Sequence, residues 1–115
     1  MILKQIEFGP NYFFIRLLVL YMDPFNIIIE EQGRKIDLNI HPQEAGSYKI
    51  VYHGGLVGEI FMGAAGENWE AVSIEDLDPG THPMYEYQDP LDDIRFILKE
   101  PVVQKIGDQI SRSYS

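Results

Sequence analysis

Three histidines and two aspartates are the residues of this sequence that are best suited to chemistry. The histidines are His41, His53 and His82, and Asp76 and Asp78 shortly precede the third of them. Imidazole nitrogens and carboxylate oxygens are common zinc ligands, and a bound zinc ion activates water in hydrolytic enzymes. The sequence contains no HExxH or HxH motif that would place them together. A small metal-dependent hydrolase using these five residues is therefore an alternative hypothesis, which requires that their predicted loops meet in space.

The other familiar catalytic patterns are absent from the sequence. Without cysteine, the chain has no thiolate zinc site and no cysteine nucleophile. Five glycines lie between Gly54 and Gly66, but the Lys-Ser or Lys-Thr pair of a phosphate-binding loop is missing. The adjacent carboxylates Glu30 and Glu31 fall on a predicted strand and point to opposite faces, so they do not form an acid/base pair. We therefore lean against an enzyme and expect no cofactor.

The acidic charge is concentrated in the second half of the chain. The net charge is −9, and no Lys or Arg occurs between Lys49 and Arg95 although ten acidic residues do. Such a surface repels nucleic-acid phosphates and attracts a basic protein. The leading hypothesis is thus a non-catalytic accessory domain that binds a basic protein through residues 67–93. The expected contact residues are Glu75, Asp76, Asp78, Tyr85 and Tyr87.

The same acidity supports a third hypothesis, a DNA-mimic inhibitor. Such a protein carries carboxylates spaced along its surface like the phosphates of a duplex, and it binds a nucleic-acid-binding protein in place of DNA. The sequence does not reveal that spacing. In each of the three hypotheses, we expect no nucleic-acid ligand.

Length and composition predict one small globular domain. The chain has 115 residues, of which 45% are hydrophobic and 23% charged, values that are near the averages for folded domains. The absence of cysteine suits a reducing compartment, and we expect a cytoplasmic protein without a membrane association.

The first 21 residues form a possible non-native extension of the domain. The run from Tyr12 to Tyr21 is apolar except for Arg16 and is too short to span a bilayer. Regular alternation begins directly after Met22. We interpret residues 1–21 as an N-terminal extension and residues 22–115 as one β-rich domain. A buried extra element or a membrane-associated tail are the alternatives for residues 1–21.

Alternation with a period of two predicts five strands from Phe25 onward. Residues 25–31 and 34–40 flank Gln32-Gly33 and predict a hairpin. Residues 47–52 and 56–62 flank His53-Gly54-Gly55 and predict a second, with Gly58 marking a bulge or a close approach of backbone. A fifth strand is expected at 69–72, where Trp69 serves as a core anchor. The loop between the hairpins is expected at 41–46.

Short helical turns and irregular segments are expected after the fifth strand. Ser73 and Asp76 have the spacing of a capping box and predict one helical turn over 73–77. Pro83 and Pro90 keep residues 81–90 irregular. For residues 90–98, a short strand and a helix that begins at Pro90 are competing predictions.

The C-terminal segment predicts an amphipathic helix. Pro101 suits its first position, and Val103, Ile106 and Ile110 recur at the spacing of one helical face. Gly107 weakens the helix but allows it to lie close to the sheet. The predicted fold is therefore α+β, a small antiparallel sheet or partial barrel of five to six short strands with the C-terminal helix packed on it. An open sheet has edge strands, so a homodimer through a sheet edge is also expected.

Overall fold

The computed structural model describes residues 23–87 and 98–113. It confirms the predicted α+β fold, an antiparallel sheet curled into a half-barrel with the C-terminal helix packed on it. In chain order the described elements are β1 (Phe25–Glu31), β2 (Arg34–Pro42), β3 (Tyr48–Tyr52), β4 (Gly55–Met62), β5 (Trp69–Ala71), the 3-10 helix η2 (Ile74–Asp76) and α2 (Glu100–Ser113).

Two tight turns reverse the chain between β1 and β2 and between β3 and β4. Gln32 and Gly33 have φ angles of 52° and 77°, and His53 and Gly54 have φ angles of 48° and 82°. Two successive positive φ angles are typical of a type I′ turn, whose twist matches that of the strands it joins. Both predicted hairpins are therefore confirmed, and the glycine at the second position adopts its angle without a steric cost.

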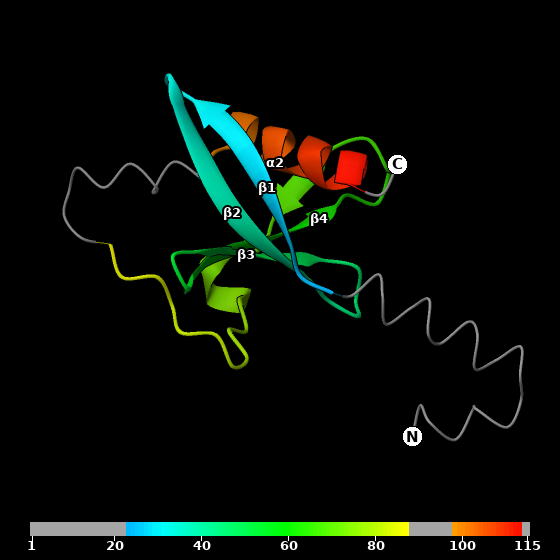
Figure 1. The fold of residues 1–115 in the computed structure, drawn as a ribbon. Coiled ribbons are helices and arrows are strands. Elements are labelled where there is room, and N and C mark those ends of the chain that lie inside the picture. Colours follow the sequence, from blue (N-terminus) through cyan, green and yellow to red (C-terminus); the bar gives the residue numbers. More distant parts are fainter. Residues whose placement is uncertain (1–22, 88–97, 114–115) are drawn as a thin grey trace, which may run out of the picture.

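The five strands form one antiparallel meander in the order β1-β2-β3-β4-β5 (Figure 1). The register pairs Ile40 with Ile50 across β2 and β3, and Ile50 with Gly58 across β3 and β4. It then shifts by one residue, because Val51 pairs with Leu56 and leaves Val57 as a bulge. A bulge bends its strand and increases the local twist. The predicted irregularity beside Gly58 is confirmed.

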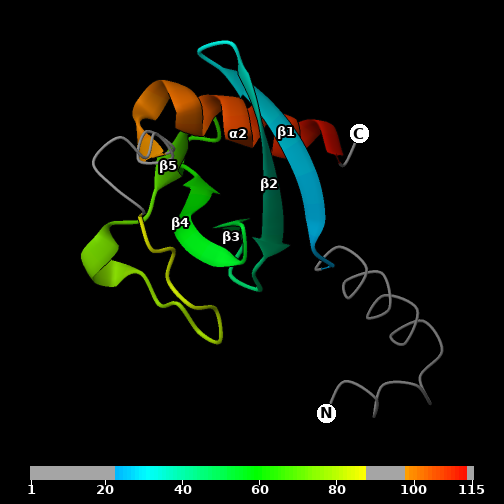
Figure 2. The same ribbon diagram turned by 60° about the vertical axis from the view of Figure 1, so that its left-hand side comes forward.

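Helix α2 lies across the open side of the curled sheet. In Figure 2 the strands form an arc, and α2 runs across it from β5 to β1. The helix contacts β1, β4 and β5, so it bridges both edge strands. Its predicted apolar stripe of Val103, Ile106 and Ile110 is buried. A helix thus occupies the position that further strands would take in a closed barrel.

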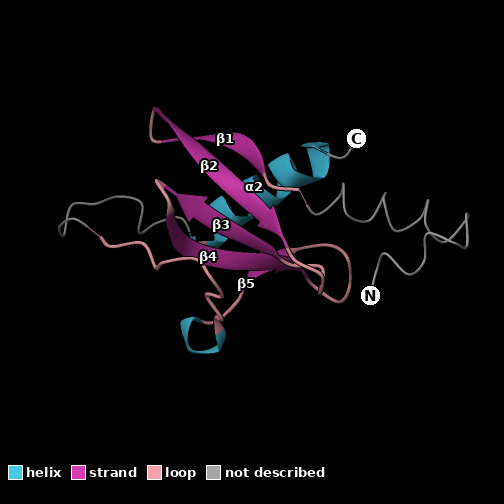
Figure 3. Cartoon of the chain, turned by 60° about the horizontal axis from the view of Figure 1, so that its bottom comes forward, coloured by secondary structure: helices cyan, strands magenta, loops and turns pink. Residues whose placement is uncertain are grey.

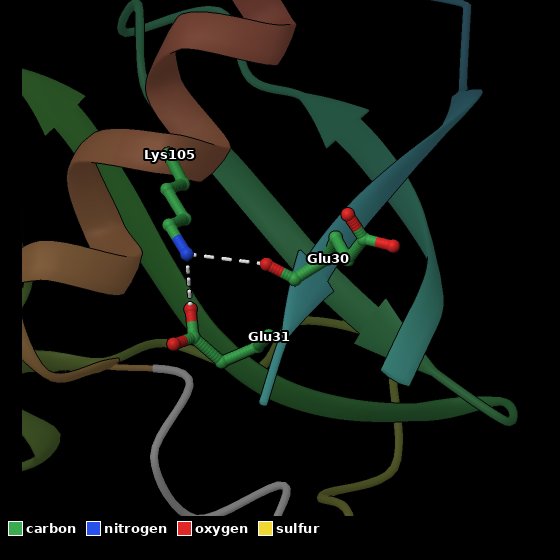
Figure 4. Close-up of polar contacts among 3 residues, drawn as sticks. All are labelled: Glu30, Glu31 and Lys105. Carbon is green, nitrogen blue, oxygen red and sulfur yellow. Dashed lines mark hydrogen bonds and ion pairs between the residues drawn. The ribbon is translucent and has the colours of Figure 1, made fainter. Parts of the chain in front are cut away.

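Two consecutive helix residues make polar contacts to the two sheet edges. The Gln104 amide binds both backbone groups of Trp69 on β5, accepting from its N–H at 3.0 Å and donating to its carbonyl at 2.7 Å. Lys105 reaches β1, where its ammonium donates to the Glu30 carbonyl at 3.1 Å and pairs with the Glu31 carboxylate at 2.7 Å (Figure 4). These contacts give each edge strand a partner from α2.

The core fills the space between the inner face of the sheet and α2. Ile40, Ile50, Ile60 and Ile106 are among its fully buried members. Trp69 is partly buried against this cluster, as predicted for a core anchor. A Cβ atom at Gly107 would overlap the Trp69 ring, so the glycine allows the close approach of helix and sheet.

Residues 72–82 lie on the side of the sheet away from α2, and residues 83–87 follow the edge of β4 back toward the core (Figure 3). It joins the edge of β4 through Leu56, whose N–H donates to the Pro83 carbonyl at 2.7 Å and whose carbonyl accepts from the Tyr85 N–H at 2.9 Å. Leu56 and Met84 form a parallel bridge. This short contact anchors the distal end of the segment to the sheet.

Three local predictions need correction. Strand β2 extends to Pro42, so His41 is in a strand and not in a loop, because it pairs with Lys49 of β3. The helical turn exists as η2, but the Ser73 hydroxyl binds the Glu75 carboxylate at 2.6 Å and caps no backbone group. Helix α2 begins at Glu100, one residue before Pro101.

Two further predictions fall outside the described residues. They concern the extension of residues 1–21 and the choice between strand and helix for residues 90–98, of which only Leu98 is described. In the described part of the chain, no helix is long and apolar enough to cross a bilayer.

Candidate functional site

A row of three charged or titratable residues crosses the outer face of the sheet, which is the face away from α2. The register pairs His41 of β2 with Lys49 of β3, and Lys49 with Glu59 of β4. Because side chains alternate between faces, the neighbours Ile40 and Ile50 point inward to the core. We call His41, Lys49 and Glu59 the outer polar row.

The residues that follow η2 cover this row. The His82 ring packs edge-on against the His41 ring, with a centroid separation of 4.6 Å and an interplanar angle of 77°. A Cβ atom built on Gly80 would lie 3.3 Å from the Lys49 ammonium nitrogen, so the backbone of Gly80 lies beside that charge. Asp78 shapes this loop by accepting from the Gly80 N–H at 3.1 Å. We call residues 77–82 the cover segment.

A chain of side-chain hydrogen bonds orients His41. The Asn39 amide nitrogen donates to the Asn26 side-chain oxygen at 2.7 Å, so the Asn39 oxygen faces His41 and accepts from its Nε2–H. This arrangement places the proton of the neutral ring on Nε2 and leaves Nδ1 unprotonated. Burial, the neighbouring His82 and the charge of Lys49 lower the pKa of His41 from its ordinary value of 6.5, with burial contributing most.

One buried nitrogen beneath the cover segment lacks a partner in the part of the chain that the structure describes. Within the described residues, His82 Nδ1 is buried and makes no hydrogen bond. Lys49 is only 8% exposed as a residue and lines the cavity described below, and within residues 23–87 and 98–113 its ammonium makes no ion pair or hydrogen bond. A buried polar group without a partner costs free energy that the same group would not lose in water, so the His82 ring lowers the stability of this contact.

A shallow polar cavity of about 430 Å³ lies next to Lys49 and is also lined by Ser47, Glu59 and Asp78. The Ser47 hydroxyl donates to the Glu59 carboxylate. Activation of a serine requires a base that is itself oriented by a third group. Within the described residues, neither His41 nor His82 makes a hydrogen bond to Ser47. This arrangement does not supply an activated nucleophile.

The structure brings together two of the three predicted metal-ligating histidines. His41 and His82 are in contact, whereas His53 lies at the other end of β3 and stacks on Tyr52 at 4.0 Å. Asp78 lies near Lys49, and Asp76 is exposed in η2. Among the residues of known placement, no group of three His, Asp or Glu side chains is arranged to hold a metal ion. Of the residues named in the hydrolase hypothesis, His41 and His82 are therefore in contact, and the described residues provide no third ligand beside them.

The two predicted contact tyrosines pack mainly inward. Tyr85 and Tyr87 are partly buried against the main core and make an edge contact of 5.0 Å with each other. Tyr85 also packs on Tyr52 at 5.5 Å. A Cβ atom on Gly55 would lie 2.6 Å from the Tyr85 Cα, so this glycine lets the segment approach β4. These rings hold the segment against the sheet, and part of the surface of each ring remains exposed to solvent.

The predicted acidic residues are exposed on the same segment. Glu75, Asp76 and Asp78 are all exposed. Two large apolar side chains accompany them, because Ile74 is 60% and Met84 45% exposed. We call these five residues the acidic face. Carboxylates beside exposed apolar groups combine long-range attraction with area that a partner can bury.

Sequence reasoning missed the role of Lys49, Asn39 and Glu59. Each lies in a predicted strand and reads as an ordinary solvent-facing residue of an alternating pattern. One signal was present, because Lys49 is the last basic residue before the long acidic stretch. Its burial depends on the cover segment, which returns to the sheet about 30 residues later in a way that local patterns do not encode.

Comparisons with protein-family models, with curated proteins and with solved structures found no match to this chain.

Proposed function

We propose that this protein is a non-catalytic interaction domain that binds a basic protein partner through the acidic face. The observation that carries the proposal is the clustering of exposed Glu75, Asp76 and Asp78 with exposed Ile74 and Met84 on one segment. Carboxylates of one sign speed association with a positive surface, while apolar side chains buried at the centre of a contact supply affinity.

The surroundings of the acidic face support this proposal. The segment lies opposite α2, so the helix that closes the core does not obstruct it (Figures 1 and 3). Tyr85 packs against the core and Leu56 holds the backbone, so the face is attached to a rigid sheet at one end. A surface that is fixed before binding loses less conformational entropy when a partner docks.

Affinity capture with the full chain from lysate of its own host tests the proposal. We expect a basic protein that is retained at low salt and released at high salt, because screening weakens attraction between exposed charges. The recovered protein is then titrated against the purified chain to obtain a Kd. A partner that normally binds DNA would convert the proposal into the DNA-mimic hypothesis.

Matched charge variants localise the contact. In the test variant, Glu75→Gln, Asp76→Asn and Asp78→Asn remove three charges from the acidic face. In the control variant, Asp23→Asn, Glu30→Gln and Asp37→Asn remove three exposed charges near or on the β1–β2 hairpin.

Both variants change the net charge equally, so general electrostatics affects them alike. We expect the test variant to weaken binding by at least about tenfold, and the control by only a few-fold. Equal losses, or no loss in the test variant, would reject the acidic face as the binding surface.

A further inference from the structure

We propose that the contact between His41 and His82 is a proton-sensitive latch, which holds the cover segment on the sheet while the His41 ring is neutral and releases it when that ring is protonated. The latch joins β2 to the cover segment, two parts of the chain that are about 40 residues apart. It is a conformational device within the chain itself, so it does not depend on the proposed function.

In the neutral state, residues of the sheet fix the orientation of the His41 ring. Asn26 holds the Asn39 side chain, and the Asn39 oxygen accepts a hydrogen bond from His41 Nε2–H. The His82 ring can then pack against a His41 ring of fixed orientation. The 4.6 Å edge contact is favourable between uncharged aromatic rings. His82 Nδ1 is buried in this contact and has no hydrogen-bond partner within the described residues.

When His41 is protonated, two cations would share one small region. Protonated His41 lies against His82 of the cover segment and close to Lys49 of β3, and Lys49 is itself largely buried. Three carboxylates, those of Glu44, Glu59 and Asp78, line the same cavity as Lys49. None of them makes an ion pair with Lys49 or with a histidine in the part of the chain that the structure describes. The repulsion is thus not neutralised by direct contact.

The direction of the pH effect follows from proton binding. In the closed form, the pKa of His41 lies below 6.5, and opening returns the ring to solvent and its pKa toward that ordinary value. The open form therefore binds more protons than the closed form at pH values around and below 6.5. Closure is complete above that pH and weakens as the pH falls through it.

Only a limited part of the chain needs to move. Beyond His82, the backbone is tied to Leu56 by the bonds to Pro83 and Tyr85. Within the cover segment, the bonds from Gly80 N–H to Asp78 and from His82 N–H to the Pro79 carbonyl are local, so lifting the segment off the sheet exposes both amides to water and to exchange. Opening would uncover the buried Lys49 beside an otherwise acidic surface.

Hydrogen exchange of the full chain tests the latch without any partner. We compare amide protection in residues 77–82 at about pH 7.5 and about pH 5.0, after correction for intrinsic exchange rates. We expect the protection of these amides to fall at the lower pH, while amides of the β3–β4 ladder keep theirs.

Two matched His-to-Phe variants identify the responsible ring. His41→Phe keeps an aromatic ring against His82 but removes the nitrogens that take up the proton, so we expect equal protection at both pH values. His53→Phe makes the same change on the ring that stacks on Tyr52 and should retain the wild-type pH response. Proton NMR of the histidine rings should also show that the pKa of His41 lies below 6.5 in the wild-type chain.

Three outcomes would overturn the latch. They are pH-independent protection of residues 77–82 in the wild-type chain, an unchanged pH response in His41→Phe, and a wild-type His41 pKa at or above 6.5. Because the cover segment includes Asp78 of the acidic face, opening would also disturb partner binding. That consequence rests on the proposed function, and its failure alone would count against the acidic face and not against the latch.

Discussion

On its inner face, the sheet is covered by α2, whose buried Ile106 and Ile110 belong to the same apolar cluster as Ile40 and Ile50. On its outer face, the sheet is covered by the cover segment, whose contacts are made by His82 and the backbone beside Lys49. Alternation along β2 and β3 produces both faces from the same strands. The inner contacts depend on area and shape, whereas the outer contacts depend on protonation.

The inner face therefore supplies the stability of the fold, and the outer face supplies its response to pH. Apolar burial holds over the whole range of pH in which the chain stays folded, so α2 should remain docked while conditions change. On the opposite side, His82 Nδ1 is buried without a hydrogen-bond partner among the described residues, which lowers the stability of the closed form proposed above. Segments of low local stability are the ones from which switches and binding elements are drawn.

The largest difference in stability between the two faces is expected when a buried side chain of the inner face is truncated. Ile106 is fully buried, and we expect Ile106→Ala to cost about 2–5 kcal/mol in the free energy of unfolding. Urea unfolding monitored by circular dichroism measures this cost. Ile28→Ala is the control, since Ile28 is 56% exposed and its truncation should cost less than about 1 kcal/mol. Similar costs at both positions would contradict the assignment of the inner face as the core.

A second change tests the close approach of α2 to β5. Gly107→Ala would improve helix propensity by about 1 kcal/mol, but the added Cβ overlaps the Trp69 ring. We expect overpacking of about 1–3 kcal/mol to dominate, with a net loss of stability and a shifted Trp69 fluorescence spectrum. A more stable variant with unchanged emission would show that the helix has room to adjust.

The polar contact at the β5 edge should have an effect of intermediate size. Gln104→Ala removes both hydrogen bonds to Trp69 and leaves two backbone groups to find water, at a cost of about 1–3 kcal/mol. Faster amide exchange at Trp69 should accompany the loss. Gln104→Glu retains an acceptor for the Trp69 N–H and should be less damaging. A variant as stable as wild type would show that α2 closes the half-barrel through its apolar stripe alone.

The outer face should respond to pH where the inner face does not. The pKa of His41 is lowered in the folded chain, mainly by burial, so the unfolded chain binds more protons below pH 6.5. We therefore expect stability to fall as the pH drops through about 6.5, and to fall less in His41→Gln. Urea unfolding at several pH values measures the difference. Parallel curves for the two proteins would remove His41 as the source.

The smallest effect is expected at the β1 edge. Lys105 and Glu31 are 49% and 20% exposed in their side chains, and such exposed pairs contribute about 0.2–1 kcal/mol. Lys105→Met should lose this amount at low salt and nearly nothing in about 1 M salt, where charges are screened. The exposed Arg112–Asp108 pair on the same helix offers a control, because Arg112→Met removes an ion pair that does not reach the sheet.

The strands, the tight turns, the C-terminal helix and the apolar side chains of the inner face follow from the amino-acid sequence alone. Alternation from Phe25 to Ile40 left one face apolar and the other polar except for Ile28, and the glycines of Gln32-Gly33 and His53-Gly54 permitted the positive φ angles of the turns. The helix stripe of Ile106 and Ile110 followed from its period in the same way. These features are local, so a single sequence contains their physical cause.

The covering of the outer face, and the polar contacts beneath it, became visible only in the tertiary structure. The pairing of His41 with Lys49 depends on β2 continuing past its predicted end, and the contact with His82 depends on the path of the chain beyond β5. Likewise, Gln104 and Lys105 reach opposite sheet edges because α2 crosses the opening of a curled sheet. Such contacts join residues far apart in sequence, and their free energies depend on register, curvature and burial that no local pattern contains.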